Sequence, residues 1–108
     1  MNAIQDCLIR NSTDENGNPT GGSVSGVGLE IQWQDGPLGR GTDRKVPNGA
    51  FVETVISAAI RRLDFYQASK FACAENAEAL VHLNIALSSL EARTQKREAR
   101  QVEGTHTA

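Results

Sequence analysis

The stretch FYQASKFACAENAEAL, residues 65–80, lies where two segments of helical apolar periodicity meet. Apolar residues before it recur at steps of three and four, which places them on one helix face: Val52, Val55, Ile56, Ala59, Leu63 and Tyr66. After it, alternating steps of four and three form the heptad seam of a helix packed on a neighbour: Asn76, Leu80, Leu83, Leu87, Leu90, Thr94 and Arg97. A short link around Ser69 and Lys70 joins the segments, so the sequence predicts an antiparallel two-helix hairpin over residues 48–102.

The N-terminal part of the chain has a different composition. Residues 3–47 hold most of the glycines and all three prolines, and their two apolar runs, AIQDCLIR and VSGVGLEIQW, are separated by NSTDENGNPTGG, which is rich in turn formers. Leu29, Ile31 and Trp33 alternate with polar residues, as a half-buried strand requires. These patterns predict a β-hairpin with a long, mobile tip, and Asn48 is expected to cap the first helix.

Together these segments predict an α+β fold: a small N-terminal antiparallel β-hairpin or sheet, then a long antiparallel two-helix hairpin that oligomerises through its helices. A chain of 108 residues suits one domain with a modest core. We expect a single domain over 1–108, with a β-rich part and glycine-rich loop at 1–47, the helical hairpin at 48–102 and a C-terminal tail at 103–108. Gly104 is expected to end the second helix, and Thr105 and His106 either enter a neighbour's site or fray.

A second stripe on the later helix is the reason to expect self-association. It consists of small or apolar residues: Ala77, Val81, Ile85, Ser88 and Ala92. One partner helix cannot cover both this stripe and the leucine seam. We therefore expect a homo-oligomer, dimer or hexamer, in which another copy covers the stripe, with the sheet as a competitor for that face.

Charge and hydropathy exclude two classes of partner. The formal net charge of −2, from 11 basic and 13 acidic residues, does not provide the basic field that non-specific DNA or RNA binding needs. No apolar run approaches the 18 or so residues of a membrane span, and the N-terminus lacks a signal-peptide pattern. We expect a cytosolic chain that binds neither nucleic acid polymers nor membranes.

The residue types needed for catalysis or for a metal centre are scarce. Neither His82 nor His106 lies in an HExxH or GxSxG context. Cys7 and Cys73 are too few for a zinc ligand set, and Cys73 is expected to be a small buried side chain. The sequence therefore predicts a protein without enzymatic activity and without a cofactor.

The loop GPLGRGTDRK is a candidate phosphate-binding segment. Residues 36–41 have the GxxxxG spacing of a phosphate loop, but Thr42 stands where a nucleotide hydrolase has its lysine. Arg40, Arg44 and Lys45 remain, and guanidinium groups with exposed backbone amides can hold a phosphate. The alternative is a solvated connection into the helix.

Four cations gather near the end of the second helix. Arg93, Arg97 and Arg100 lie at steps of four and three on one face, with Lys96 beside them, and like charges so spaced destabilise an isolated helix by roughly 0.2–0.5 kcal/mol per pair. Only Arg100 has a carboxylate three or four residues away, that of Glu103. The helix macrodipole accounts for one or two of these cations. The others indicate an external anion, either a carboxylate of another subunit or a phosphate of a ligand.

The polar ends of the leucine seam are further candidate ligand contacts. The Thr94 hydroxyl can add a donor beside the arginines. Asn76 either satisfies backbone groups in the first turn of its own helix or reads a base or ribose edge, with Tyr66 or Phe65 as the stacking face. At 1.5 Å of rise per residue, Asn76 and Arg93 lie about 25 Å apart on one helix. One small ligand therefore cannot contact both in one protomer, so either a second subunit brings them together or there are two sites.

The segments RLDFYQ, FACAENAEAL, LEART and REARQVEGTH together resemble the helical hairpin domain shared by phage anti-Thoeris and anti-CBASS sponge proteins, over about half the chain. The preceding GLEIQWQDGPLGRG looks like the strand and loop that the anti-Thoeris branch places ahead of its helices. The resemblance implies binding without catalysis. Such proteins sequester the cyclic nucleotide signals of bacterial immunity, chiefly cyclic ADP-ribose isomers such as glycocyclic ADP-ribose, and some also hold cyclic di- or trinucleotides in separate pockets of a hexamer.

The resemblance also implies site residues and a location, the cytoplasm of an infected bacterial host. By motif position, Tyr66 or Phe65 and Asn76 belong to the ADP-ribose-type pocket, together with Arg40 or Arg44 of the loop. The residues implied for a second pocket, or for the first pocket reached across a subunit interface, are Arg93, Thr94 and Arg97.

Two other functions compete with this expectation. The arginines could pair with carboxylates of a protein partner, which would make the chain a helical protein–protein interaction module. An enzyme that cleaves the messenger is the third hypothesis, but no acid, base or metal set for it is visible in the sequence.

Overall fold

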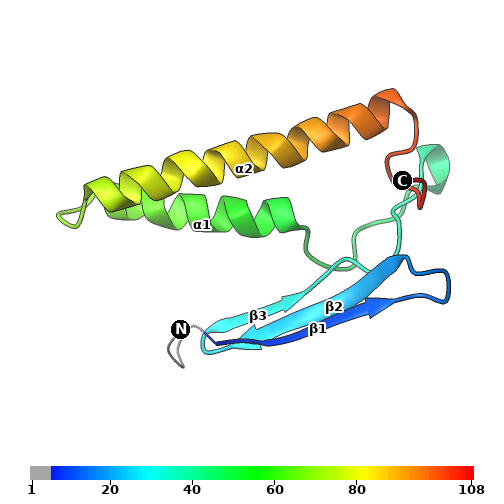
Figure 1. The fold of residues 1–108 in the computed structure, drawn as a ribbon, viewed down its shortest axis with the longest axis horizontal. Helices are drawn as coiled ribbons and strands as arrows, with labels where there is room; N and C mark the ends of the chain where they lie inside the picture. The colour runs from blue at the N-terminus through cyan, green and yellow to red at the C-terminus, as the bar shows by residue number, and fades with distance from the viewer. Residues whose placement is uncertain (1–5) are drawn as a thin grey trace. The chain divides into compact units, whose positions relative to one another are not determined.

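The computed structural model describes residues 6–108, which form two compact units. The first unit comprises the described residues up to Phe51 together with Val102–Ala108, and the second is Val52–Gln101. A three-stranded antiparallel sheet, a short 3-10 turn and two helices follow one another along the chain (Figure 1). This arrangement confirms the predicted α+β fold. The C-terminal tail, set apart in the prediction, belongs to the first unit.

The first unit is built on a sheet with the strand order β1-β2-β3. Its strands are β1 (Leu8–Thr13), β2 (Pro19–Gly26) and β3 (Leu29–Gln32). The register pairs Ile9 with Val24 and Val24 with Ile31, so three β-branched side chains form a row on one face. The predicted hairpin is therefore a three-stranded sheet, because a turn at Gly28, with a φ of 72°, divides the run VSGVGLEIQW into two strands. Residues 3–5 of the first apolar run lie outside the described residues.

The predicted long tip between the first two strands is wrong. Most of NSTDENGNPTGG is strand, and the remaining turn is closed by Asp14. The Asp14 carboxylate accepts hydrogen bonds from the backbone N–H of Asn16 (2.9 Å) and of Asn18 (3.0 Å), and from Asn18 Nδ2 (3.1 Å). These hydrogen bonds, the side-chain bond from Asn18 above all, lower the pKa of the Asp14 carboxyl from its usual value.

The connection into the first helix overturns the predicted cap. Helix α1 spans Val52–Gln67, whereas Asn48 turns back to the end of the sheet. Asn48 Oδ1 accepts from the Asp35 N–H (2.9 Å), and Asn48 Nδ2 donates to the Asp35 carbonyl (3.0 Å). The Asn48 N–H donates to Gln34 Oε1 (2.8 Å). Because both amide atoms of Asn48 are engaged with Asp35, the residue anchors the connection and does not cap α1.

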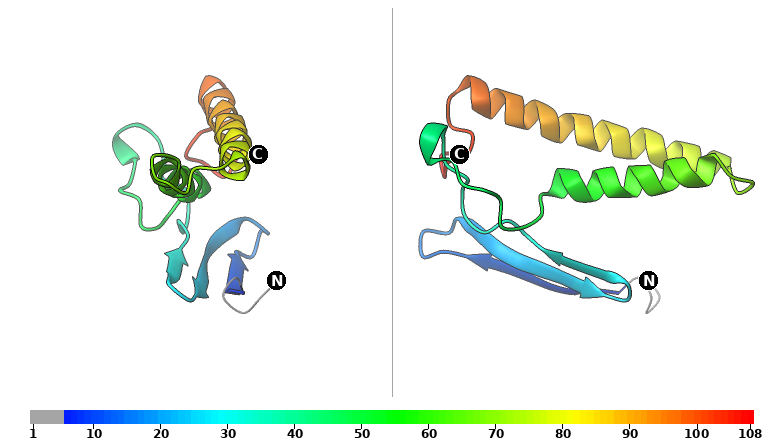
Figure 2. Two further views of the ribbon diagram at one scale, coloured as in Figure 1. Left: turned by 90° about the vertical axis from the view of Figure 1, so that its left-hand side faces the viewer. Right: turned by 180° about the vertical axis from the view of Figure 1, so that it is seen from behind.

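The second unit is the predicted helical hairpin. Helix α2 spans Ala74–Ala99 and lies beside α1, antiparallel to it, in all three views (Figures 1 and 2). Every residue of the predicted leucine seam is partly buried except Thr94. On α1 the predicted face is rotated, because Ile60 is buried at 8% exposure and Ala59 is exposed. The side chains of α1 that share this buried face follow steps of four and three: Ile56, Ile60 and Leu63.

The second stripe of α2 is exposed in the protomer. Val81 and Ile85 are 56% and 58% exposed, and the other members of the stripe, Ala77, Ser88 and Ala92, are exposed as well. Among residues 6–108 the buried apolar side chains are those of Leu38 and Ile60. Each unit thus has a very small core of its own. The second stripe of α2 is an exposed surface of small and apolar side chains that no other part of the described chain covers.

Candidate functional site

The end of α1 presents a cluster of two aromatic rings and one guanidinium. The Phe65 and Tyr66 ring centroids lie 6.2 Å apart with an interplanar angle of 52°. The Arg62 guanidinium carbon lies 5.0 Å from each centroid, and Arg62 Nε donates to Tyr66 Oη (3.1 Å). The predicted stacking residues are thus held together by an arginine that the sequence reading missed. Its spacing of three and four residues from the rings is the signal that could have identified it.

The turn between the helices fixes where α2 begins. Gln67 bridges it with two hydrogen bonds to Cys73: Oε1 accepts from the Cys73 N–H and Nε2 donates to the Cys73 carbonyl, both at 3.0 Å. Cys73 Sγ then accepts from the Asn76 N–H (3.4 Å) as the N-cap of α2. The prediction of a buried Cys73 is wrong, because the side chain is exposed and is used as a cap.

The side-chain amide of Asn76 is available for recognition. Cys73 satisfies the Asn76 backbone N–H, and within residues 6–108 the Asn76 side chain has no hydrogen-bond partner of its own. The structure therefore contradicts the alternative in which the Asn76 side chain satisfies backbone groups at its own helix terminus. A partly buried amide with two donors and one acceptor oxygen can read the polar edge of a base or ribose.

The arginine cluster at the far end of α2 is only partly compensated. Arg93 is exposed and has no ion-pair partner among the described residues, whereas Arg97 is partly buried and does have an interaction within the chain. Thr94 Oγ1 donates to the Leu90 carbonyl (3.3 Å), which leaves its lone pairs free to accept. The expected local partner of Arg100 is absent, because the Glu103 carboxylate binds Arg44 of the loop (2.6 Å).

The helix keeps the two predicted groups of site residues apart. Asn76 lies in the first turn of α2 and Arg93 in its last third, and the helix between them is continuous. At 1.5 Å of rise per residue their separation is about 25 Å. Asn76 and the aromatic cluster thus both lie at the turn end of the hairpin, whereas the arginine cluster lies toward the other end of α2.

The glycine-rich loop is attached to the C-terminal tail. The Arg44 guanidinium binds Glu103 through two hydrogen bonds, Nη1 to Oε2 (2.6 Å) and Nη2 to Oε1 (3.1 Å). Arg40 Nη1 donates to the Glu103 carbonyl (2.9 Å), and the Gly39 N–H donates to the Gly104 carbonyl (2.8 Å). A Cβ at Gly104, which has a φ of 80°, would collide with the Gly39 carbonyl oxygen. We call this set of contacts between residues 39–44 and 103–104 the loop–tail clasp.

The C-terminal tail is held within its own protomer. It packs on its own unit instead of fraying, and Asn18 Nδ2 lies 3.5 Å from His106 Nδ1. Thr105 Oγ1 donates to the Val102 carbonyl (2.5 Å). Gly104 does not end α2, which stops at Ala99, and it serves the clasp instead.

The described part of the chain lacks the side-chain cluster needed for metal ligation and the helix needed to span a membrane. Residues 6–108 contain no group of three or more His, Cys, Asp or Glu side chains arranged to hold a metal ion. Neither helix within that range combines the length and the apolar character that crossing a bilayer requires.

Comparison with known proteins places the helical hairpin in a family. Residues 26–95 match the family described as Acb2/Tad1, hairpin domain. Over 59 residues the chain is 49% identical to a protein of Bacillus phage SBSphiJ7 named Thoeris anti-defense 1, an alignment that covers 55% of the chain and 42% of the relative. The chain thus matches less than half of that relative's length. All predicted site residues fall within the family match except Arg97.

Proposed function

The chain belongs to the Acb2/Tad1 hairpin-domain family, and we propose that it is a phage anti-defence protein that binds a cyclic nucleotide immune signal and withholds it from the Thoeris system. The signal class we propose is a cyclic ADP-ribose isomer, such as glycocyclic ADP-ribose. The protein binds it without cleaving it, in the cytoplasm of the infected bacterium. Support comes from the family membership and from the name of the relative.

The observation that carries the proposal is that an unsatisfied amide and an aromatic cluster both lie at the end of the hairpin where the two helices are joined. Asn76 offers its side-chain amide, and Phe65 and Tyr66 offer exposed rings, at 61% and 37% exposure. A base stacked on such a ring gains ~1–3 kcal/mol, and the amide can read its polar edge. This end of the hairpin is the proposed base-binding site.

The arginine cluster cannot contact the ligand of the base-binding site within one protomer. Arg93, Thr94 and Arg97 stand about 25 Å from Asn76 on the same helix, too far for one small ligand to contact both groups. In an assembly a second copy brings its arginines to the base-binding site, or the arginines form a separate pocket for cyclic di- or trinucleotides of CBASS-type signalling. Arg40 of the loop is proposed to add a further phosphate contact.

Self-association through α2 is part of the proposal. The uncovered stripe is accompanied by a groove of about 420 Å³ whose lining includes Ile85, Ser88 and Ala92. Small side chains allow two helices to approach closely, and the apolar ones gain by leaving water. A dimer, or a hexamer built from dimers, would cover this surface.

The test is recovery of unmodified ligand. Purified protein is mixed with glycocyclic ADP-ribose, free ligand is removed, the protein is denatured by heat, and the supernatant is analysed by mass spectrometry. Recovery of intact ligand is expected. Sequestration at cellular messenger levels requires a nanomolar Kd, about 12 kcal/mol of binding free energy. Absence of binding at micromolar protein, or release of a converted product, would overturn the proposal.

The exposed stripe also favours a second candidate function. A helical interaction module would use the groove beside Ile85 for a partner protein and the arginines for that partner's carboxylates. This candidate predicts assembly that depends on the arginines and no binding of cyclic ADP-ribose isomers.

A further inference from the structure

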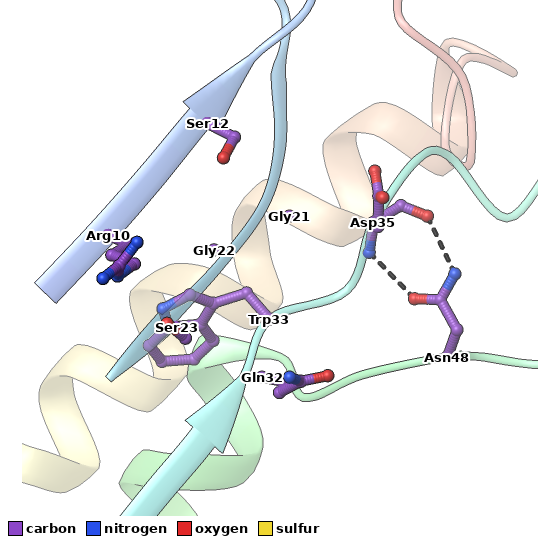
Figure 3. A pocket seen from close by; sticks show the side chains of 9 residues that line it. All are labelled: Arg10, Ser12, Gly21, Gly22, Ser23, Gln32, Trp33, Asp35 and Asn48. Atoms are coloured by element: carbon purple, nitrogen blue, oxygen red, sulfur yellow. Dashed lines mark hydrogen bonds between the residues drawn. The ribbon is translucent and has the colours of Figure 1, made fainter. Parts of the chain in front are cut away.

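An open pocket of about 430 Å³ lies on the sheet of the first unit and shares no residue with the site proposed above (Figure 3). Residues from all three strands and from the segments that follow β3 line it, among them Arg10, Ser23, Trp33 and Asp35. The volume falls within the range of roughly 300–1,000 Å³ found for small-molecule sites. The pocket therefore has the capacity for one small organic ligand.

The register of the sheet explains why polar groups converge there. Arg10 on β1 pairs with Ser23 on β2, and Ser23 pairs with Gln32 on β3, so the three side chains form one transverse row on one face. Ser12 has no partner in this register, which shifts between Asn11 and Thr13, but it also lines the pocket. At Gly22 a Cβ would collide with the Arg10 carbonyl oxygen, so this part of the pocket is bare backbone.

The aromatic wall of the pocket is held in place by the backbone. The Trp33 N–H donates to the Gly22 carbonyl (3.0 Å), and Trp33 forms a parallel bridge with Ala50. In Figure 3 the indole extends from the end of β3 toward β2 and the side of the sheet on which Arg10 lies. The ring is only partly buried, so part of its surface remains available for stacking.

The polar groups of the pocket have unused binding capacity. Within the part of the chain that the structure describes, the side chains of Arg10, Ser12 and Ser23 make no hydrogen bond or ion pair. Asn48 is the contrast, because both its amide atoms bind the backbone of Asp35, as the dashed lines of Figure 3 show. These two bonds fix the Asp35 backbone at the pocket wall, and among residues 6–108 the Asp35 carboxylate has no partner.

We propose that this pocket binds a nucleoside monophosphate. The base stacks on Trp33, the phosphate binds the Arg10 guanidinium with the serine hydroxyls as donors, and the Asp35 carboxylate accepts from a ribose hydroxyl. One guanidinium and one carboxylate give the lining no net charge. A single phosphate is therefore favoured over a polyphosphate, which would need more cations.

This site goes beyond the sequestration of cyclic signals. Arg10, Ser12 and Ser23 precede residue 26, where the family match begins, so they come from a part of the chain that the match does not cover. The helical site and the sheet pocket lie in different units. Their binding can therefore be lost independently.

The test uses Trp33 as its own reporter, because it is the only tryptophan of the chain. Full-length protein is titrated with AMP, adenosine and inorganic phosphate while tryptophan fluorescence is recorded. Saturable quenching by AMP is expected, with weaker quenching by adenosine and little by phosphate. Arg10→Ala should raise the Kd for AMP by roughly tenfold or more, since a hydrogen-bonded charge pair is lost, and Arg10→Lys should restore part of the affinity.

Two controls separate this site from the helical one. Arg93→Ala should leave the AMP titration unchanged. Arg61→Ala removes a cation of the same type from α1, outside the pocket lining, and should also leave the AMP titration unchanged. Circular dichroism checks that Arg10→Ala remains folded. Absence of saturable quenching, an unchanged Kd in Arg10→Ala, or loss of AMP binding in Arg93→Ala would each overturn the proposal. None of these outcomes depends on whether cyclic ADP-ribose isomers bind.

Discussion

Single residues decide which polar groups at the hairpin turn remain available to a ligand. The side chain of an asparagine in the first turn of a helix commonly forms hydrogen bonds with backbone groups at the helix terminus. Here Cys73 Sγ accepts a hydrogen bond from the Asn76 N–H, and the Asn76 side chain has no partner among residues 6–108. Because the Cys73 sulfur caps the helix, the Asn76 side chain is not needed there and remains available for ligand recognition.

This separation gives a prediction for Asn76→Ala. Because its side chain makes no hydrogen bond within the described chain, its removal should change the unfolding free energy by at most about 0.5 kcal/mol. Affinity for the cyclic ADP-ribose isomer should fall by roughly tenfold, the loss of one or two hydrogen bonds. Calorimetric titration and urea denaturation measure the two quantities. Cys73→Ala is the matched variant, with a loss of about 0.5–1 kcal/mol of stability and retained binding.

The Arg62 guanidinium provides a second test at this scale. It lies 5.0 Å from both aromatic centroids, and such contacts at exposed positions contribute about 0.5–1 kcal/mol. Arg62→Ala should therefore weaken ligand binding about two- to fivefold by loosening the rings. Arg61 is its exposed neighbour, and Arg61→Ala should have no effect in the same titration. Equal effects of the two variants would mean that only the overall charge matters.

At the scale of elements, local patterns predicted the helices better than the connections. Leu80, Leu83 and Leu87 belong to a seam with alternating steps of three and four residues. This spacing identified α2 because the seam packs against one neighbouring helix, α1. On α1 both Ala59 and Ile60 continue a helical step from Ile56, and only packing against α2 determined that the larger side chain is buried.

The connections depend on partners that are distant in sequence, which spacing rules do not detect. Asn48 is a good cap by residue type, but Asp35 offers it two backbone partners. Glu103 has Arg100 within one helical turn, yet it binds Arg44, 59 residues away. A bidentate contact on a fixed loop outcompetes a pair on a helix end that has already stopped.

The loop–tail clasp predicts the behaviour of Glu103→Gln. The two side chains are 43% and 21% exposed, so solvent screens the pair and its contribution is at most about 1 kcal/mol. Glu103→Gln should lower the unfolding free energy by that amount in dilute buffer and by less in high salt. Urea denaturation at two ionic strengths measures this. Glu91→Gln, at an exposed site on α2, should show no salt-dependent loss.

The turn between β1 and β2 should be sensitive to acid. Hydrogen bonds from Asn18 and Asn16 hold the pKa of the Asp14 carboxyl below its usual value of 3.8. A carboxyl whose pKa is lowered in the folded state stabilises that state above its unfolded pKa, and this contribution is lost as pH falls through the folded pKa. The amide proton shifts of Asn16 and Asn18 should therefore change together below pH 3.8. In Asp14→Asn this joint transition should disappear, and its persistence would assign it to another group.

At the scale of the whole molecule, the small cores of the two units and the uncovered stripe of α2 support the proposed self-association. The two groups of predicted site residues lie about 25 Å apart on one helix. Assembly is the simplest way for them to meet. A ligand that contacts both groups would then also stabilise the oligomer, because it binds the assembled state alone.

Charge reversal at Arg93 distinguishes the two candidate functions. If the arginines bind phosphate, Arg93→Glu should abolish binding of the cyclic ADP-ribose isomer and leave the oligomer mass unchanged, because the substitution lies outside the stripe. If they bind carboxylates of another subunit, the same change should dissociate the assembly.

Ile85→Glu places a charge within the exposed stripe and should raise the dissociation constant of the oligomer by at least roughly tenfold under either function. Gln95→Glu adds the same charge at an exposed site near Arg93 and should alter neither property. Light scattering after size exclusion, beside calorimetric titration of the same samples, reads mass and binding together. Loss of the oligomer in Arg93→Glu with wild-type assembly in Ile85→Glu would contradict both the proposed site and the proposed interface.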